Sequence, residues 1–151
     1  MVYENARTAL ENCYAIDECK SWADKAAAIA SYARQIQDES SLNFAQQIRG
    51  RAWRQMGELL KQIEPQRGAN QNIQDDDLKV TRKEAANKAG LSERQRKDSL
   101  RVASIPKSDF EELVESETPP TTTQLAALGT VTKLIDRLWT YSLNTSNVLQ
   151  I

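Results

Sequence analysis

The stretch over residues 81–103, TRKEAANKAGLSERQRKDSLRVA, predicts two short helices separated by a glycine turn. Thr81 and Ser92 each stand three residues before a Glu or Gln, which is the spacing of a capping box. In that motif the hydroxyl and the later side chain satisfy each other's backbone N–H groups at a helix start. Gly90 lies between the two starts, where a chain leaving a helix often needs a left-handed residue. The stretch therefore predicts a helix-turn-helix.

The composition predicts an all-α protein. The chain has 151 residues, of which 40% are hydrophobic and 27% charged, and helix-favouring Ala, Gln, Glu, Lys, Arg and Leu dominate it. Alternating β-branched runs are absent, so no strand is expected. No run approaches the roughly 20 apolar residues of a membrane span, and the first residues lack a signal sequence. We therefore expect a cytoplasmic protein.

Catalysis is not expected, and neither is a cofactor or a bound metal. Histidine, the commonest general base and metal ligand, is absent from the chain. Cys13 and Cys19 are six residues apart, which matches neither a redox motif nor metal-ligand spacing. We interpret them as small helix-face residues in a reducing compartment.

Residues 1–63 are predicted to form three helices, the first over about 4–14. The second, expected from a cap at Asp17 to about Gln37, carries one apolar stripe that needs a partner surface. Its members are Trp22, Ala26, Ile29, Ala30, Ala33 and Ile36. The tetrad DESS at 38–41 then supplies a break and a new cap before a longer helix.

This third helix has apolar residues at alternating spacings of three and four, which predicts a coiled-coil seam and a homodimer. The seam consists of Leu42, Ala45, Arg49, Ala52, Met56, Leu59 and Ile63. Arg49 and Trp53 allow two interpretations. They either pack in a helix–helix interface, the reading we favour, or contact a nucleic acid through phosphate and base stacking. Residues 64–79, rich in Pro, Gly, Asn and Gln, are predicted to be a flexible linker between this dimerisation arm and a second module.

Charge is concentrated in that second module. Residues 79–107 hold nine Lys or Arg against three Asp or Glu, whereas the whole chain has a net charge of −1. Neutralised phosphates supply much of the affinity for duplex DNA, and the second helix of a helix-turn-helix enters the major groove. The candidate DNA contacts are Arg82, Lys83, Ser92, Glu93, Arg94, Arg96, Lys97 and Arg101. A solvated basic helix pair without a DNA role is the alternative.

From residue 84 onward the stretch resembles the helix-turn-helix of ParB/KorB-type partition and operator-binding proteins. The turn glycine, the serine cap and an L-R-x-x-x-x-P ending carry this resemblance at Gly90, Ser92, Leu100, Arg101 and Pro106. Arg96 departs from it, because the motif usually places a branched apolar core residue there. The resemblance implies further short helices up to about Gly129. It does not extend to residues 1–63, so CTP binding is not implied.

The later helices are predicted from two more capping boxes, at Ser108 and Thr121, with a helix end at Gly129. A last amphipathic helix follows, with Val131, Leu134, Ile135, Leu138 and Ser142 at helical spacing. Such a face docks on the body of the protein or on a second subunit. Residues 144–151 are expected to fray.

Two functions remain open from the sequence. The first is a homodimeric duplex-DNA-binding protein, an operator-binding regulator or a partition-type factor. The layout of the chain, a helical arm followed by this module, also resembles that of proteins from bacteriophages and prophages. The alternative is a phage-encoded helical inhibitor or adaptor of the anti-defence type that acts on a host protein complex. The near-neutral total charge and the acidic stretch at 109–117 favour this alternative.

Overall fold

The computed structural model describes the backbone of residues 2–63 and 80–148, and the side chains of 3–63 and 80–140. These ranges contain seven helices and no strand, so the all-α prediction is confirmed. The predicted linker at 64–79 lies outside the described residues. Within them, no helix is long and apolar enough to cross a membrane.

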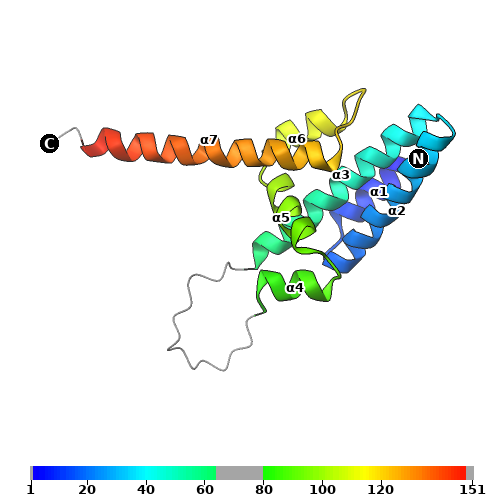
Figure 1. Ribbon diagram of the computed structural model, residues 1–151, viewed down its shortest axis with the longest axis horizontal. Coiled ribbons are helices and arrows are strands. Elements are labelled where there is room, and N and C mark those ends of the chain that lie inside the picture. The colour runs from blue at the N-terminus through cyan, green and yellow to red at the C-terminus, as the bar shows by residue number, and fades with distance from the viewer. Residues whose placement is uncertain (1, 64–79, 149–151) are drawn as a thin grey trace.

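The first three helices are α1 (Val2–Glu11), α2 (Ile16–Gln35) and α3 (Glu39–Gln62), and they lie side by side (Figure 1). Asp38 caps α3 as expected, since its carboxylate accepts a hydrogen bond from Ser41 N at 3.1 Å. The predicted cap at Asp17 is wrong. The cap position of α2 lies two residues earlier, at Ala15, and it has no side-chain cap.

Small residues bring α2 close to α3. The buried side of α2 consists of Cys19, Ala23, Ala26, Ala30 and Ala33. This face is rotated from the predicted stripe, because Ile29 and Ile36 are about half exposed. Alanine and cysteine permit a closer approach of the two backbones than isoleucine would.

The seam of α3 is buried within the single chain, which corrects the predicted dimer interface. Ala45, Ala52, Met56 and Leu59 are buried, while Leu42, Arg49 and Ile63 are half-buried. Most of the buried seam residues belong to a core shared with α1 and α2. A dimer through this seam would require the helices of each chain to separate, so the dimerisation role of these seven residues does not fit the fold.

The predicted helix-turn-helix is confirmed in its local geometry. It consists of α4 (Arg82–Lys88) and α5 (Glu93–Val102), and both expected capping boxes are present, at Thr81 and at Ser92. Gly90 has φ +77°, the left-handed conformation that glycine adopts without a Cβ penalty. Local sequence alone therefore sets this turn.

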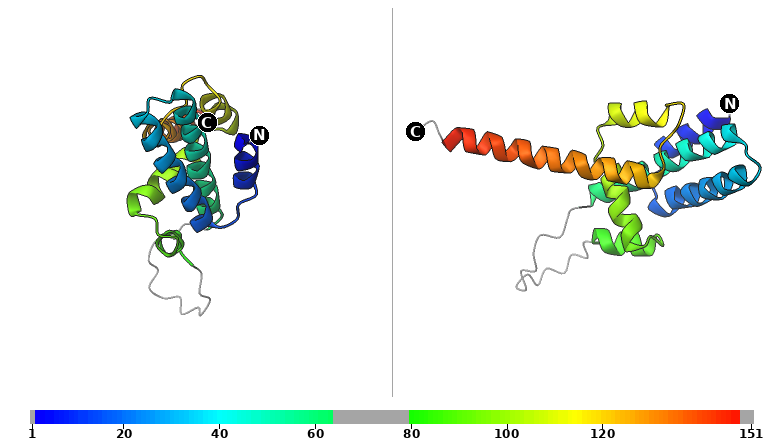
Figure 2. Two further views of the ribbon diagram at one scale, coloured as in Figure 1. Left: turned by 90° about the vertical axis from the view of Figure 1, so that its right-hand side faces the viewer. Right: turned by 45° about the horizontal axis from the view of Figure 1, so that its top comes forward.

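Two glycines place α5 between other helices. A Cβ on Gly57 of α3 would lie 2.0 Å from Ser99 O, and one on Gly129 would lie 1.8 Å from Arg101 O. Only residues without a side chain can approach the α5 backbone this closely. Helix α5 is therefore held on one side by α3 and on another by the last helix, α7 (Thr122–Val148) (Figure 2).

Gly129 was predicted to end a helix, but this prediction is wrong, because Gly129 lies inside α7. The predicted cap at Ser108 is also wrong: Pro106 is the N-cap of α6 (Lys107–Val114). The box at Thr121 and Gln124 is confirmed. Residues 144–148, expected to fray, continue α7, while 149–151 lie outside the described residues.

A buried arginine joins the parts of the chain before and after residues 64–79. Arg51 of α3 donates two hydrogen bonds to Glu111 of α6, at 2.9 and 2.8 Å, and a third to Glu115. Its Nε donates to the Tyr3 hydroxyl at 3.0 Å. The predicted arm and module therefore pack together, and two carboxylates of the acidic stretch at 109–117 are satisfied inside the fold.

Candidate nucleic-acid interface

The exposed face of α5 carries a stripe of charge. Its members recur three and four residues apart, as one helix face requires, and are Glu93, Arg94, Lys97, Asp98 and Arg101. The Ser92 cap fixes the start of this helix. The Arg94 side chain is 82% exposed, and those of Lys97 and Arg101 are about half exposed. Three cations therefore face solvent along almost the whole helix.

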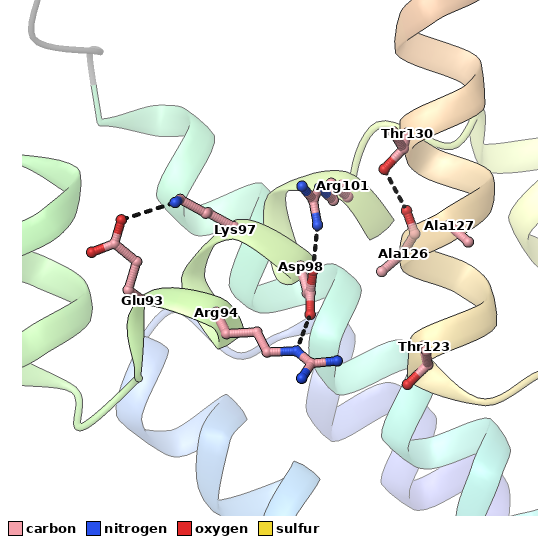
Figure 3. Close-up of a pocket in the computed structure, with 9 residues that line it drawn as sticks. All are labelled: Glu93, Arg94, Lys97, Asp98, Arg101, Thr123, Ala126, Ala127 and Thr130. Atoms are coloured by element: carbon pink, nitrogen blue, oxygen red, sulfur yellow. Dashed lines mark hydrogen bonds and ion pairs between the residues drawn. The ribbon is translucent and has the colours of Figure 1, made fainter.

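Each of these cations pairs with a carboxylate of the same helix (Figure 3). Lys97 lies 3.0 Å from Glu93, while Arg94 and Arg101 lie 3.5 and 2.8 Å from Asp98. The hydrogen bond from Lys97, together with its charge and that of Arg96, lowers the pKa of Glu93. An exposed pair such as Lys97–Glu93 contributes little to stability, so an incoming phosphate can replace Glu93. The Asp98 side chain is only 14% exposed and holds the two arginines more firmly.

A groove of about 490 Å3 runs between this face of α5 and the first half of α7. Its far wall consists of Thr123, Ala126, Ala127 and Thr130 (Figure 3). Small residues on this wall leave the α5 side chains open to the groove. The Thr130 hydroxyl donates to Ala126 O at 3.0 Å within α7, so the wall offers few free polar groups of its own. Recognition in the groove therefore depends on α5.

Four cations from α3, α4, α5 and α7, namely Lys61, Arg82, Arg101 and Arg137, lie near enough to Lys133 for their charges to act on it, and we call these five residues the basic cluster. Burial and then the charges of the other four members lower the pKa of Lys133. A cation that is disfavoured by its neighbours gains from a nearby anion, because a phosphate relieves their mutual repulsion. Arg101 of α5 belongs to both the stripe and the cluster, so this residue links the two sets of cations, which together we call the basic surface.

Two of the predicted DNA-contacting side chains, Arg82 and Ser92, are already hydrogen-bonded within the protein. Arg82 donates to Ile63 O at 2.6 Å and to Lys61 O at 3.2 Å, so it caps the end of α3. The Ser92 hydroxyl is occupied in its capping box. The structure brings Arg94, Lys97 and Arg101 together on one face, with Glu93 paired among them. Lys83 is exposed on α4.

Arg96 occupies the position where the motif expects a core residue. Its side chain is neither buried in the core nor fully exposed to solvent. Its side chain is 20% exposed, and its buried Nε has no hydrogen-bond partner. The guanidinium reaches Glu93 at 3.4 Å. Buried Ser99, Val102 and Ala103 close the core against α3 and α6 instead of a branched residue at 96. Arg96 is therefore poorly placed to read DNA.

Sequence reasoning missed Lys61, Lys133 and Arg137 as parts of the basic surface. Lys133 and Arg137 are four residues apart, which placed both on one side of the last helix and was a usable signal. That these residues approach Arg101 depends on the contact at Gly129, which no local pattern encodes. Lys61 also donates to Ala103 O at 2.5 Å and so contributes mainly its charge.

The nucleic-acid interpretation of Arg49 and Trp53 is not supported by their positions. Trp53 is buried in the core of α1, α2 and α3, where no base can stack on it. Burial, followed by repulsion from Arg34, lowers the pKa of Arg49. These residues pack between helices of one chain.

The cysteines lie apart from this surface. Cys19 Sγ donates a hydrogen bond to Cys13 Sγ at 2.8 Å, and both side chains are buried. Within the described ranges, no group of three Cys, Asp or Glu side chains is arranged to hold a metal ion. The basic surface of α5 and α7 is thus the strongest candidate site.

Comparison of the chain with protein-family models, with curated proteins and with solved structures finds no match.

Proposed function

We propose that the protein binds duplex DNA through α5, as an operator-binding regulator or partition-type factor. The observation that carries the proposal is the basic face of α5, on which Arg94, Lys97 and Arg101 face solvent along a capped helix. The charges of Lys133 and Arg137 on α7 add to it, since Arg101 and Arg137 both act on Lys133. Arginine and lysine bind phosphates and also donate to guanine in the major groove. The resemblance of residues 81–129 to ParB/KorB-type proteins points to the same function.

Because α7 crosses the end of α5, we expect the two ends of α5 to contact different parts of the DNA. Arg101 lies where α7 crosses closest, at Gly129, so a duplex cannot approach it as deeply as it can the start of α5. Arg94 is the most exposed cation of the stripe and sits in the first turn, the part of a recognition helix that contacts bases. In this arrangement Arg94 and Lys97 contact base edges or nearby phosphates. Arg101, Lys133 and Arg137 hold the phosphate backbone.

A fluorescence-anisotropy titration of a labelled duplex of about 30 base pairs at low salt tests this proposal. The triple variant Arg94→Ala, Lys97→Ala, Arg101→Ala should weaken binding at least tenfold, because three exposed cations are lost. Circular dichroism should show an unchanged fold, since none of the three side chains is buried.

The matched control carries Lys25→Ala and Arg34→Ala, two exposed cations of α2 outside the basic surface. This variant should bind like the wild type. If the control loses as much affinity as the triple variant, the attraction is general charge and α5 is not the site. If the wild type binds no duplex at low salt, yet a host protein co-purifies with it after nuclease treatment, the inhibitor or adaptor alternative replaces DNA binding.

A further inference from the structure

From Leu128 onward, α7 presents an apolar face that no other described part of the structure covers. In Figure 1 and in the right-hand view of Figure 2, α7 extends away from the other helices toward its C-terminal end. Six large apolar side chains are between 42% and 68% exposed there: Leu128, Val131, Leu134, Ile135, Leu138 and Trp139. We call these six residues the α7 apolar face. Half-exposed side chains of this size present roughly 500 Å2 of apolar surface, which is at the upper end for a monomer.

This face points away from the body of the protein. Helix α7 packs inward through Leu125, Ala126 and Gly129. Leu138 follows Gly129 by nine residues, about two and a half helical turns, and so lies on the opposite side of the helix. The polar side, which carries Lys133 and Arg137, belongs to the basic cluster. One helix thus has a basic side next to α5 and an apolar side that lacks a partner among the described residues.

We propose that the α7 apolar face binds the same face of a second copy of this chain and forms a homodimer. Leu128, Val131, Ile135 and Leu138 are spaced three, four and three residues apart, which is the a/d spacing of a coiled coil. In that register, Leu134 and Trp139 take the flanking g and e positions. A parallel pair of helices brings a g residue beside the e residue five positions later on the partner helix, so Leu134 contacts Trp139 of the second copy.

The charges of α7 are compatible with self-association. Lys133, Asp136 and Arg137 fall at the outer b, c and f positions, so no charge lies on the seam or beside it. Two copies of the face therefore meet without like-charge repulsion. An interface of roughly 1,000 Å2 over both chains is at the lower end for specific complexes, so the dimer should depend on concentration in the micromolar range.

This dimer is independent of DNA binding by α5, and the two proposals can fail separately. Sedimentation equilibrium of the full chain without DNA, from about 1 to about 300 µM, should show the average mass rising from that of a monomer toward twice that value. The double variant Leu134→Glu, Leu138→Glu should stay monomeric throughout this range. Thr140→Glu adds a charge at an outer position of the same helix and should still dimerise.

Two results would overturn the proposal. One is a wild-type chain that remains monomeric at about 300 µM. The other concerns the apolar groove between Trp22, Ile29 and Phe44, which could receive α7 from another copy. Ile29→Glu should leave the dimer intact. If it abolishes association as fully as the α7 variant does, the face docks in that groove and does not pair with itself.

Discussion

Helices α3 and α7 have nearly the same spacing of apolar residues, but these residues are buried in α3 and exposed in α7. In α3, Ala52 and Met56 are buried by the other helices of the chain. In α7, Leu134 and Leu138 remain more than half exposed. The difference lies in what surrounds each helix: α3 passes through the centre of the fold, whereas α7 leaves the body after Gly129. A heptad pattern shows that a face needs a partner, but it does not say whether the partner belongs to the same chain.

Matched truncations of the two faces should give the largest contrast. Met56→Ala removes fully buried atoms and should lower the free energy of unfolding by about 2–5 kcal/mol. Leu134→Ala lies on an exposed face and should change it by less than about 0.5 kcal/mol in dilute solution. Urea unfolding followed by circular dichroism measures both. Equal losses would mean that the α7 apolar face is covered within the monomer.

The contact between α3 and α5 can be tested at its glycine. Gly57→Ala should destabilise the protein by about 1–3 kcal/mol, because the new Cβ meets the backbone of Ser99. Alanine favours a helix by roughly 1 kcal/mol over glycine, so propensity alone predicts the opposite sign. Gly50→Ala is the control, since its Cβ would meet side chains and no backbone atom: Leu125 at 3.1 Å and Val114 at 3.7 Å. A thermal melt in which Gly57→Ala is the more stable variant would refute this packing.

Acid should loosen the attachment of α6 to α3. The hydrogen bond from Arg51 lowers the pKa of Glu111. For Glu115, the hydrogen bonds from Tyr3 and Arg51 lower the pKa against the opposing effect of burial. A carboxyl group with a lowered folded-state pKa contributes stability above its ordinary value of about 4.3, and this contribution is lost as the pH falls through the folded pKa. Stability should therefore fall between about pH 5 and pH 3.

Arg51→Met is the test of that pH dependence. The variant should lose about 1–3 kcal/mol at pH 7, because both partly exposed glutamates lose their hydrogen bonds from Arg51. Its unfolding free energy should also vary less steeply below pH 5 than that of the wild type. Parallel pH curves for the two proteins would assign the acid sensitivity to other carboxylates.

The smallest effect concerns the turn between α2 and α3. Gln37 has φ +57°, and Asp38 N donates to Ala33 O at 2.9 Å, as at a helix end that favours glycine. Gln37→Gly should stabilise the protein by about 0.5–1 kcal/mol, measured by urea unfolding. A loss of stability would show that the Gln37 side chain contributes contacts that outweigh the backbone strain.

Features set by neighbouring residues could be predicted from the sequence. The capping boxes at Thr81, Ser92 and Thr121, the turn at Gly90 and the all-α class depend on short-range chemistry, and all are confirmed. The cap expected at Ser108 failed because α6 already begins at Lys107, and Glu111 binds Arg51, sixty residues earlier in the chain. A local motif cannot register such a competitor.

In the candidate site, too, local features could be predicted and long-range contacts could not. Arg94, Lys97 and Arg101 could be predicted, because one helix places them on one face. The approach of Lys133 and Arg137 depends on Gly129 packing against α5, whereas the sequence pattern indicated a helix end there. Arg82 was misassigned for a similar reason, since the carbonyl groups that it caps belong to α3. Long-range packing decides which cations are free.

The salt dependence of duplex affinity tests DNA binding by α5 and α7 most directly. The slope of log affinity against log salt concentration reports the number of phosphates that the protein neutralises. Compared with the wild type, Lys97→Ala and Lys133→Ala should each lower the magnitude of that slope by about 1, because each removes one phosphate contact. The exposed Lys25→Ala should leave it unchanged. Identical slopes for the wild type and both α5 and α7 variants would contradict DNA binding through this surface.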